Sequence, residues 1–195
     1  MEIKNITVFC GARTGNRPVY IKSAYELGAC LAKSGIGVVY GGGAVGLMGA
    51  VADGALDNGG KVTGVIPQFL VDREMAHKKV QHLEIVQTMH ERKEMMEELG
   101  DAVISLPGGA GTLEEFFEVF TWGQIGLHEK PIGLLNAAGF YDELLQLFGK
   151  LIDEGFLHEK YMGQLFTGGN GSEILRKFKG FTPVEVRTYD DIKRR

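Results

Sequence analysis

The sequence lacks most of the features that assign a chain to a special class of protein. It has only two cysteines among 195 residues, Cys10 and Cys30, and they form no metal-binding or redox spacing. Its five histidines form none of the paired motifs of zinc enzymes. No run of about 18 apolar residues is present, which is the length that a membrane-spanning helix needs. These absences predict a protein with no metal and no membrane segment.

Excess positive charge is also missing. The chain has 21 Lys and Arg against 25 Asp and Glu, a formal net charge of −4, so nothing in its charge predicts nucleic-acid binding. The single basic cluster, at 193–195, is interpreted as part of a loosely held, solvated tail over residues 181–195. The N-terminal segment is too short and too β-like for a signal peptide, so we expect a cytoplasmic protein.

Glycine is abundant, with 29 residues, and it gathers where apolar runs end. The runs at 3–9, 36–40, 61–66, 82–86, 102–106 and 131–135 are typical of buried strands. Helical patterns lie between them, including 47–56, 91–99 and 141–151. This alternation predicts an α/β, Rossmann-like, three-layer αβα fold with a mainly parallel sheet. We expect a single domain over residues 1–180.

The most informative segment is PGGAGTLEE, residues 107–115. It lies between the predicted strand 102–106 and an apolar segment, 116–120, that is interpreted as helix. A glycine-rich turn between a strand and a helix directs several backbone N–H groups to one point, at the positive end of the helix dipole. The segment therefore predicts a phosphate site beside a carboxylate, Glu115.

Glu115 has two interpretations. On a helical projection it lies away from the polar arc of Glu114, Glu118 and Thr121, among residues that predict burial. It either complements the helix dipole as an ordinary early-helix acid, or it faces a cleft beside a bound phosphate.

Arg92 belongs to a second cluster, MHERK at 89–93. It shares a helical face with Met95, Met96 and Leu99, so we expect it to point inwards near the start of its helix. A buried arginine needs a carboxylate or a phosphate as its partner. Glu115 is the candidate, and a structural pair with another acid is the alternative.

A G-x-G-x-x-G pattern occurs at Gly41, Gly43 and Gly46. A nicotinamide-binding fold also needs an acid at the end of the next strand, but 61–66 reads KVTGVI and has none. The pattern therefore disfavours a dehydrogenase. It favours a turn that approaches a smaller ligand or a neighbouring helix.

Together, PGGAGTLEE, MHERK and YGGG at 40–43 resemble the Lonely Guy (LOG) family of phosphoribohydrolases, over residues 3–178. Many members carry the label lysine decarboxylase, but no pyridoxal-phosphate signature is apparent. The resemblance implies a homodimer that needs no cofactor. It implies hydrolysis of the N-glycosidic bond of adenine-type nucleoside 5′-monophosphates, such as AMP and cytokinin riboside 5′-monophosphate, to the base and ribose 5-phosphate.

The resemblance also implies roles for individual residues. Arg92 and Glu115 match the catalytic pair of the family. The matching substrate-binding positions are Glu74, Lys93, Gly108, Gly109, Ala110, Gly111, Thr112, Leu113 and Glu114. Ala110 stands where plant members often have an aromatic residue, which leaves the preferred base open. A non-catalytic nucleotide binder or molybdenum-cofactor carrier of the same fold is the alternative, and it has no need of the Arg92–Glu115 pair.

Overall fold

Seven strands form one sheet in the computed structural model, which describes residues 2–73 and 75–188. The spatial order is β4-β3-β2-β1-β5-β6-β7, and every neighbouring pair is parallel. The strands are β1 (Asn5–Phe9), β2 (Gly37–Tyr40), β3 (Val62–Pro67), β4 (His82–Val86), β5 (Ala102–Ser105), β6 (Ile132–Leu135) and β7 (Leu165–Gly168). The six predicted strands are confirmed, and β7 was not predicted.

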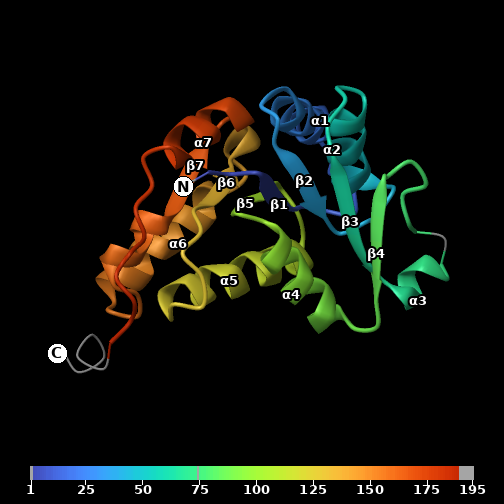
Figure 1. Ribbon diagram of the computed structural model, residues 1–195. Coiled ribbons are helices and arrows are strands. Elements are labelled where there is room, and N and C mark those ends of the chain that lie inside the picture. Colours follow the sequence, from blue (N-terminus) through green and yellow to red (C-terminus); the bar gives the residue numbers. More distant parts are fainter. Residues whose placement is uncertain (1, 74, 189–195) are drawn as a thin grey trace.

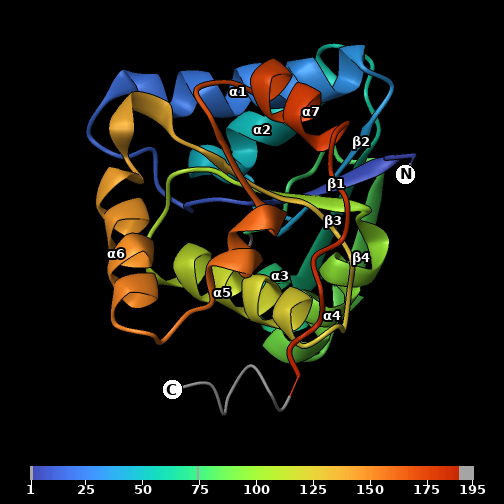
Figure 2. The same ribbon diagram turned by 90° about the vertical axis from the view of Figure 1, so that its left-hand side faces the viewer.

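Helices cover both faces of the sheet (Figures 1 and 2). One face carries α1 (Pro18–Lys33), α2 (Gly46–Leu56) and α7 (Gly171–Phe178). The other carries α4 (Met89–Leu99), α5 (Ala110–Gln124) and α6 (Asp142–Asp153). A short helix, α3 (Gln68–Val71), follows β3 near the β4 edge, and 3₁₀ turns occupy Ala137–Gly139 and Glu159–Gln164. The three-layer αβα prediction is therefore confirmed.

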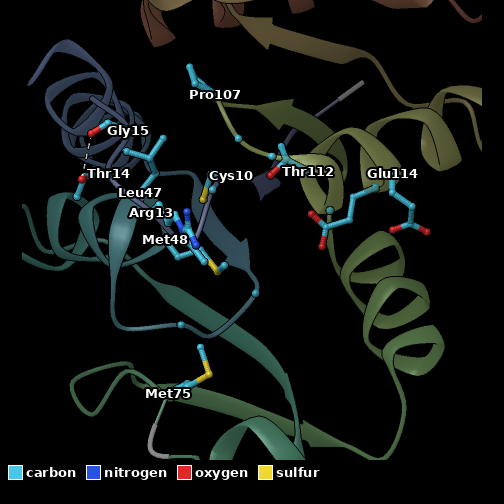
Figure 3. Close-up of a pocket in the computed structure, with 18 of the residues that line it drawn as sticks. Cys10, Arg13, Thr14, Gly15, Leu47, Met48, Met75, Pro107, Thr112 and Glu114 are labelled. Carbon is cyan, nitrogen blue, oxygen red and sulfur yellow. Dashed lines mark hydrogen bonds between the residues drawn. The ribbon is translucent and has the colours of Figure 1, made fainter. Parts of the chain in front are cut away.

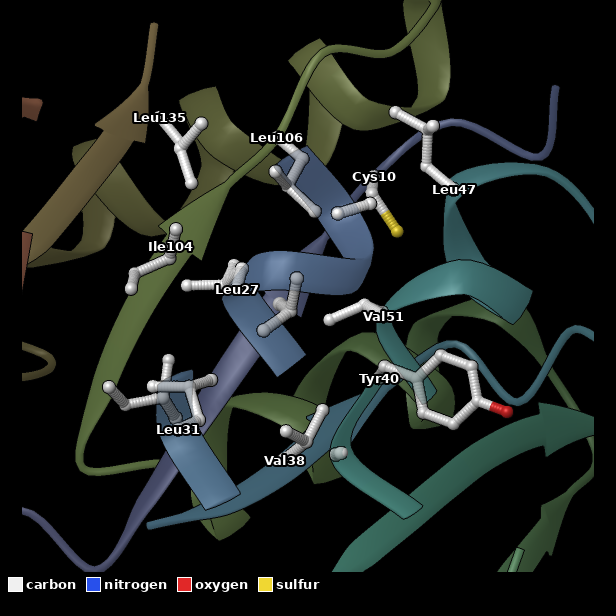
Figure 4. Packing of buried hydrophobic residues seen from close by; sticks show 14 of the residues in the cluster. Cys10, Leu27, Leu31, Val38, Tyr40, Leu47, Val51, Ile104, Leu106 and Leu135 are labelled. Atoms are coloured by element: carbon white, nitrogen blue, oxygen red, sulfur yellow. The ribbon is translucent and has the colours of Figure 1, made fainter. Parts of the chain in front are cut away.

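The strands are apolar on both faces because each face is covered by helices. Successive residues point to opposite sides, so Ile6 and Val8 of β1 join the core under α1 and α2, whereas Phe9 joins the core under α4 and α5. Figure 4 shows Leu27 and Leu31 of α1 packed into the first of these cores.

The chain reverses its direction of travel across the sheet at β1. It runs outwards from β1 through β2 and β3 to β4, returns to β5 on the other side of β1, and continues to β7. The turns that follow β1 and β5 are tied together by a hydrogen bond from Gly11 N to Pro107 O (3.1 Å), and Leu47 N at the start of α2 donates to Gly11 O (3.0 Å). Three turns therefore meet at the carboxyl edge of the sheet, at the switch point where such folds bind ligands.

Two segments differ from the sequence-based expectation. Helix α5 begins at Ala110, so part of the glycine-rich segment that was expected to be a turn contributes the first turn of the helix. Residues 181–188 are not loosely held: Val184 packs on the core under α5, and Arg187 N donates to Gln124 O (2.8 Å). The basic cluster at 193–195 lies outside the described residues.

Candidate active site

A cavity of about 520 Å³ opens at this switch point, between the turns that follow β1, β2 and β5 (Figure 3). Its polar and charged lining comes from Arg13, Thr14, Arg92, Thr112, Glu114 and Glu115. Its apolar lining includes Leu47, Met48, Ile66, Leu70, Met75 and Met89. In Figure 3, Thr112 on α5 lies across the opening from Arg13, Leu47 and Met48, whereas the side chain of Glu114 points away from them.

Arg92 and Glu115 form a buried ion pair in the wall of this cavity. Nη1 of Arg92 donates to Oε1 of Glu115 (2.9 Å), and Nε of Arg92 donates to the carbonyl of Val65 (3.2 Å). Arg92 is 6 % exposed and Glu115 is 7 % exposed. The predicted inward direction of Arg92 and its pairing with Glu115 are therefore confirmed as geometry.

Two local features hold Arg92 in this place. Thr88 caps α4 by accepting a hydrogen bond from Glu91 N (3.1 Å), which fixes the first turn of the helix just before Arg92. Gly41, at the end of β2, provides the space for the guanidinium. A Cβ atom at Gly41 would lie 1.9 Å from Nη2 of Arg92, so only glycine permits this approach.

The electrostatics distinguish the acid from the thiol beside it. Burial raises the pKa of the Glu115 carboxyl above its ordinary value, and the charge and hydrogen bond of Arg92 oppose that shift. Burial also raises the pKa of the Cys10 thiol, and the negative charge of Glu115 raises it further. Because the nucleophilic form of cysteine is the thiolate, Cys10 is a neutral part of the wall.

The start of α5 presents free backbone donors to the cavity. Its first intrahelical hydrogen bond runs from Leu113 N to Gly109 O (3.1 Å), so the N–H groups of residues 110–112 precede the helical ladder. A Cβ atom at Gly109 or Gly111 would meet no atom of the described residues within 4 Å. The turn is therefore open to a ligand, and these donors lie at the positive end of the α5 dipole.

The other predicted site residues are divided between the cavity and its surroundings. Gly108, Gly109, Gly111, Thr112 and Glu114 line the cavity, whereas Ala110, Leu113 and Lys93 do not. The ammonium of Lys93 contacts the carboxylates of Glu114 (2.5 Å) and Glu118 (3.0 Å). Glu74 lies outside the described residues.

Sequence reasoning missed several lining residues. Arg13, Thr14 and Tyr20 belong to the turn after β1 or to α1, and the methionines Met48, Met75 and Met89 come from three separate segments. The signal for the first group was the glycine-containing turn at 11–15, which follows a strand as the 107–115 segment does. Nothing in the sequence singled out Met48 or Met75, whereas Met89 belongs to the MHERK cluster that was noted for Arg92.

The G-x-G-x-x-G turn is filled by the protein itself. Besides the contact of Gly41 with Arg92, a Cβ atom at Gly46 would lie 2.3 Å from the carbonyl carbon of Ala12, and one at Gly42 would lie 2.9 Å from Cβ of Ile66. These glycines allow close packing against the protein's own atoms, and Gly41 and Gly43 also line the cavity. The interpretation that they serve close approach agrees with these contacts.

Among the residues that the structure describes, no group of three or more His, Cys, Asp or Glu side chains is arranged to hold a metal ion. Within the same ranges, no helix has the length and apolar character needed to cross a bilayer.

Comparison with known proteins places these features in a family. Residues 48–178 match the family described as possible lysine decarboxylase. A probable cytokinin riboside 5′-monophosphate phosphoribohydrolase of Oryza sativa subsp. japonica is 48 % identical over 177 residues, covering 91 % of this chain and 79 % of the rice protein. A cytokinin riboside 5′-monophosphate phosphoribohydrolase of Arabidopsis thaliana is 42 % identical, covering 93 % of this chain and 85 % of the relative.

Solved structures share the fold at lower identity. The molybdenum cofactor binding protein of Rippkaea orientalis has a TM-score of 0.70 at 23 % identity, covering 92 % of this chain and 97 % of that protein. The molybdenum cofactor carrier protein of Chlamydomonas reinhardtii has a TM-score of 0.71 at 19 % identity, covering 92 % and 98 %. At this identity the likeness concerns the fold alone. The sequence relatives show the family as well as the fold. The chain belongs to the Lonely Guy (LOG) family of cytokinin riboside 5′-monophosphate phosphoribohydrolases.

Proposed function

We propose that this protein is a phosphoribohydrolase that cleaves the N-glycosidic bond of adenine-type nucleoside 5′-monophosphates, with Arg92 and Glu115 as its catalytic residues. The products are the free base and ribose 5-phosphate. The observation that supports this most directly is a buried Arg92–Glu115 pair in the wall of the same cavity as an open helix N-terminus. Binding alone needs the helix terminus, but it gives no reason to bury an arginine and a carboxylate beside it.

The 5′-phosphate is assigned to the start of α5. The backbone N–H groups of the turn and the hydroxyl of Thr112 supply its hydrogen bonds, and no metal is needed. A nucleoside without a phosphate leaves these donors unpaired, so discrimination between nucleotide and nucleoside is expected to be large.

Glu115 is assigned the chemical step. Cleavage passes through an oxocarbenium-like centre with positive charge on the anomeric carbon, and a carboxylate beside that carbon stabilises it. The ionised carboxylate also orients or deprotonates the attacking water. Arg92 fixes the orientation of Glu115 and contacts the ribose or phosphate, for which a guanidinium of constant charge is suited.

The base is assigned to the apolar wall. Met48, Met75 and Met89 offer flexible, polarisable contacts that accommodate a planar ring with or without a prenyl chain. Both AMP and cytokinin riboside 5′-monophosphate are therefore proposed as substrates. Glu74 is proposed as a further contact to the sugar or base, from the family match alone.

We also propose that the protein acts as a homodimer in the cytoplasm. Family membership supports the dimer, and so do the large apolar side chains exposed directly after α5, such as Leu127 at 66 % exposure. The two cysteines are unpaired, which fits a reducing compartment. Light scattering of the purified protein tests the dimer.

The test of function is incubation with AMP and, separately, with adenosine, followed by chromatography of adenine and ribose 5-phosphate. We expect adenine from AMP and none from adenosine. Glu115→Gln and Arg92→Ala are expected to lower kcat by about 10²- to 10³-fold with the fold intact.

Glu143→Gln is the matched control, because it removes an exposed carboxylate from the first turn of another helix, α6. Near-normal turnover by Glu115→Gln would show that its assigned role is wrong. If neither AMP nor a prenylated adenine nucleotide is cleaved, while thermal denaturation still reports nucleotide binding, the non-catalytic binder replaces the enzyme.

A further inference from the structure

Two ion pairs run side by side between the starts of α4 and α5. Adjacent residues on α4, Arg92 and Lys93, pair with adjacent residues on α5, Glu115 and Glu114 respectively. Lys93 also reaches Glu118, one turn further along α5 (3.0 Å). The first pair lines the cavity; in the second pair Glu114 lines it as well, whereas Lys93 does not.

Lys93 is turned away from the ligand. Consecutive residues of a helix point about 100° apart, so Arg92 and Lys93 do not face the same side. The Lys93 side chain is 8 % exposed and does not line the cavity, and its ammonium is held between two carboxylates. Burial lowers the pKa of this ammonium, but its hydrogen bonds to Glu114 and Glu118 outweigh burial and leave the pKa above its ordinary value. Lys93 is therefore a permanent buried cation.

We infer that Lys93 is a positioning residue that ties α4 to Glu114 and Glu118 and so holds the Arg92–Glu115 pair in place, without touching the substrate. This inference rests on the proposed function. It differs from the role implied by family resemblance, in which Lys93 binds the nucleotide. The geometry supports positioning because, among the residues that the structure describes, the ammonium donates its hydrogen bonds to two carboxylates of α5.

Lys93 also acts on Glu115 through its charge. Besides the partner Arg92, the charged groups that influence Glu115 are Glu114, which raises the pKa of the carboxyl, and Lys93, which lowers it. Removing Lys93 takes away a positive charge that favours the ionised carboxylate and leaves the negative charge of Glu114 beside Glu115 uncompensated. The carboxyl of Glu115 then binds a proton more readily, and less of it is ionised at a given pH.

The test compares Lys93→Met with the wild-type protein on AMP. Methionine keeps an unbranched apolar side chain of similar length, and the two freed carboxylates are exposed enough to be hydrated. We expect kcat to fall by about 10-fold through lost positioning, with KM changed by less than about threefold. The acidic limb of the kcat–pH profile is expected to move to higher pH. Lys93→Arg should restore most of the activity.

The double variant Lys93→Met/Glu114→Gln separates charge from packing. It removes the freed carboxylate whose charge raises the pKa of Glu115, so the acidic limb should return part of the way towards the wild-type position. A rise in KM with an unshifted acidic limb would overturn the inference and make Lys93 a substrate contact. Wild-type kinetics in Lys93→Met would overturn it as well.

A second readout does not need the reaction. NMR titration of the Glu115 carboxyl in the ligand-free protein, with the signal assigned by its loss in Glu115→Gln, should give a higher pKa in Lys93→Met than in the wild type. If the wild type hydrolyses no nucleotide but this shift is present, the proposed function fails and the positioning role remains. An unchanged Glu115 pKa in Lys93→Met would overturn the electrostatic role of Lys93 even if hydrolysis is confirmed.

Discussion

The chain contains two glycine-rich turns at the same edge of the sheet, and they have opposite uses. The turn between β2 and α2, residues 41–46, is closed: its glycines face atoms of the protein, among them the guanidinium of Arg92 and the backbone of Ala12. The segment between β5 and α5 is more open. Gly108 faces Thr112, but no atom of the described residues lies within 4 Å of a Cβ atom built at Gly109 or at Gly111 in the first turn of α5.

The difference shows that a glycine pattern after a strand does not identify a phosphate site by itself. In the closed turn, the missing side chains make room for other parts of the same chain, among them the side chain of Arg92, the proposed catalytic arginine. In the open turn, the missing side chains leave backbone N–H groups accessible at a helix terminus. The same substitution should therefore have opposite effects in the two turns.

The largest effect is expected from Gly46→Ala in the closed turn. Gly46 has φ +65°, and its Cβ atom would lie 2.3 Å from the carbonyl carbon of Ala12. Backbone strain and overpacking together should lower the free energy of unfolding by about 3–5 kcal/mol, measured by urea denaturation. Gly59→Ala is the control, because Gly59 has φ +72° and open space around it. Equal losses in the two variants would show that the contact with Ala12 relaxes freely.

Gly41→Ala should lower the activity while leaving the fold intact. The new Cβ atom displaces Nη2 of Arg92 and disturbs its pairing with Glu115, so we expect kcat on AMP to fall by about 100-fold. A Cβ atom at Gly43 would have the Sδ atom of the flexible Met48 side chain as its nearest neighbour, at 3.1 Å. Gly43→Ala should therefore lower kcat much less than Gly41→Ala does. Losses of similar size in both variants would contradict the specific link between Gly41 and Arg92.

In the open turn, Gly111→Ala should leave stability unchanged or raise it by about 0.5 kcal/mol, because alanine favours helix and meets no neighbour. KM for AMP should rise by about 10-fold, since the methyl group intrudes on the proposed phosphate site. Gly149→Ala, on α6 with equally open surroundings, should gain the same stability without changing KM. An unchanged KM in Gly111→Ala would place the phosphate elsewhere.

The smallest expected effect is on the pH dependence of kcat. Burial raises the pKa of Glu115 and Arg92 opposes the shift. Because the ionised form is the active one, kcat should decline as the pH falls through a value above the ordinary range of a glutamate. Displacing Arg92 by Gly41→Ala removes the opposing charge and should move this limb to still higher pH, whereas Gly111→Ala should not move it. Rate profiles from pH 4 to 8 test both statements.

The six predicted strands were accessible from the sequence because strands covered on both faces are continuous apolar runs. The inward direction of Arg92, the fourth residue of helix α4, could be predicted from its spacing to Met96, which is fully buried. Strand β7 escaped prediction because it has four residues, two of them Thr and Gly, which leave no periodic signal. The start of α5 was placed too late because glycine is a poor helix former, and two glycines flank Ala110.

The site was predicted in its chemistry more than in its packing. The pairing of Arg92 with Glu115 followed from the need of a buried cation for a partner. The dependence of that pair on Gly41 could not be predicted. Gly41 lies at the end of β2 and Arg92 lies on α4, and nothing in the sequence indicates that these two residues are in contact. Lys93 shows the converse: its family match predicts a substrate contact, but its helical position turns it towards Glu114 and Glu118.

The pairing of β1 with β5 has a consequence for folding. Ile6 lies opposite Ala102, so the two sides of the cavity come from strands that are neighbours in space and distant along the chain. The cavity is complete only when both strands are in place, and we expect pairing between strands so distant along the chain to form slowly. A nucleotide at the proposed site then stabilises only the finished sheet, by mass action. A nucleotide bound at the proposed site would contact the turns that follow both strands and would therefore oppose their separation.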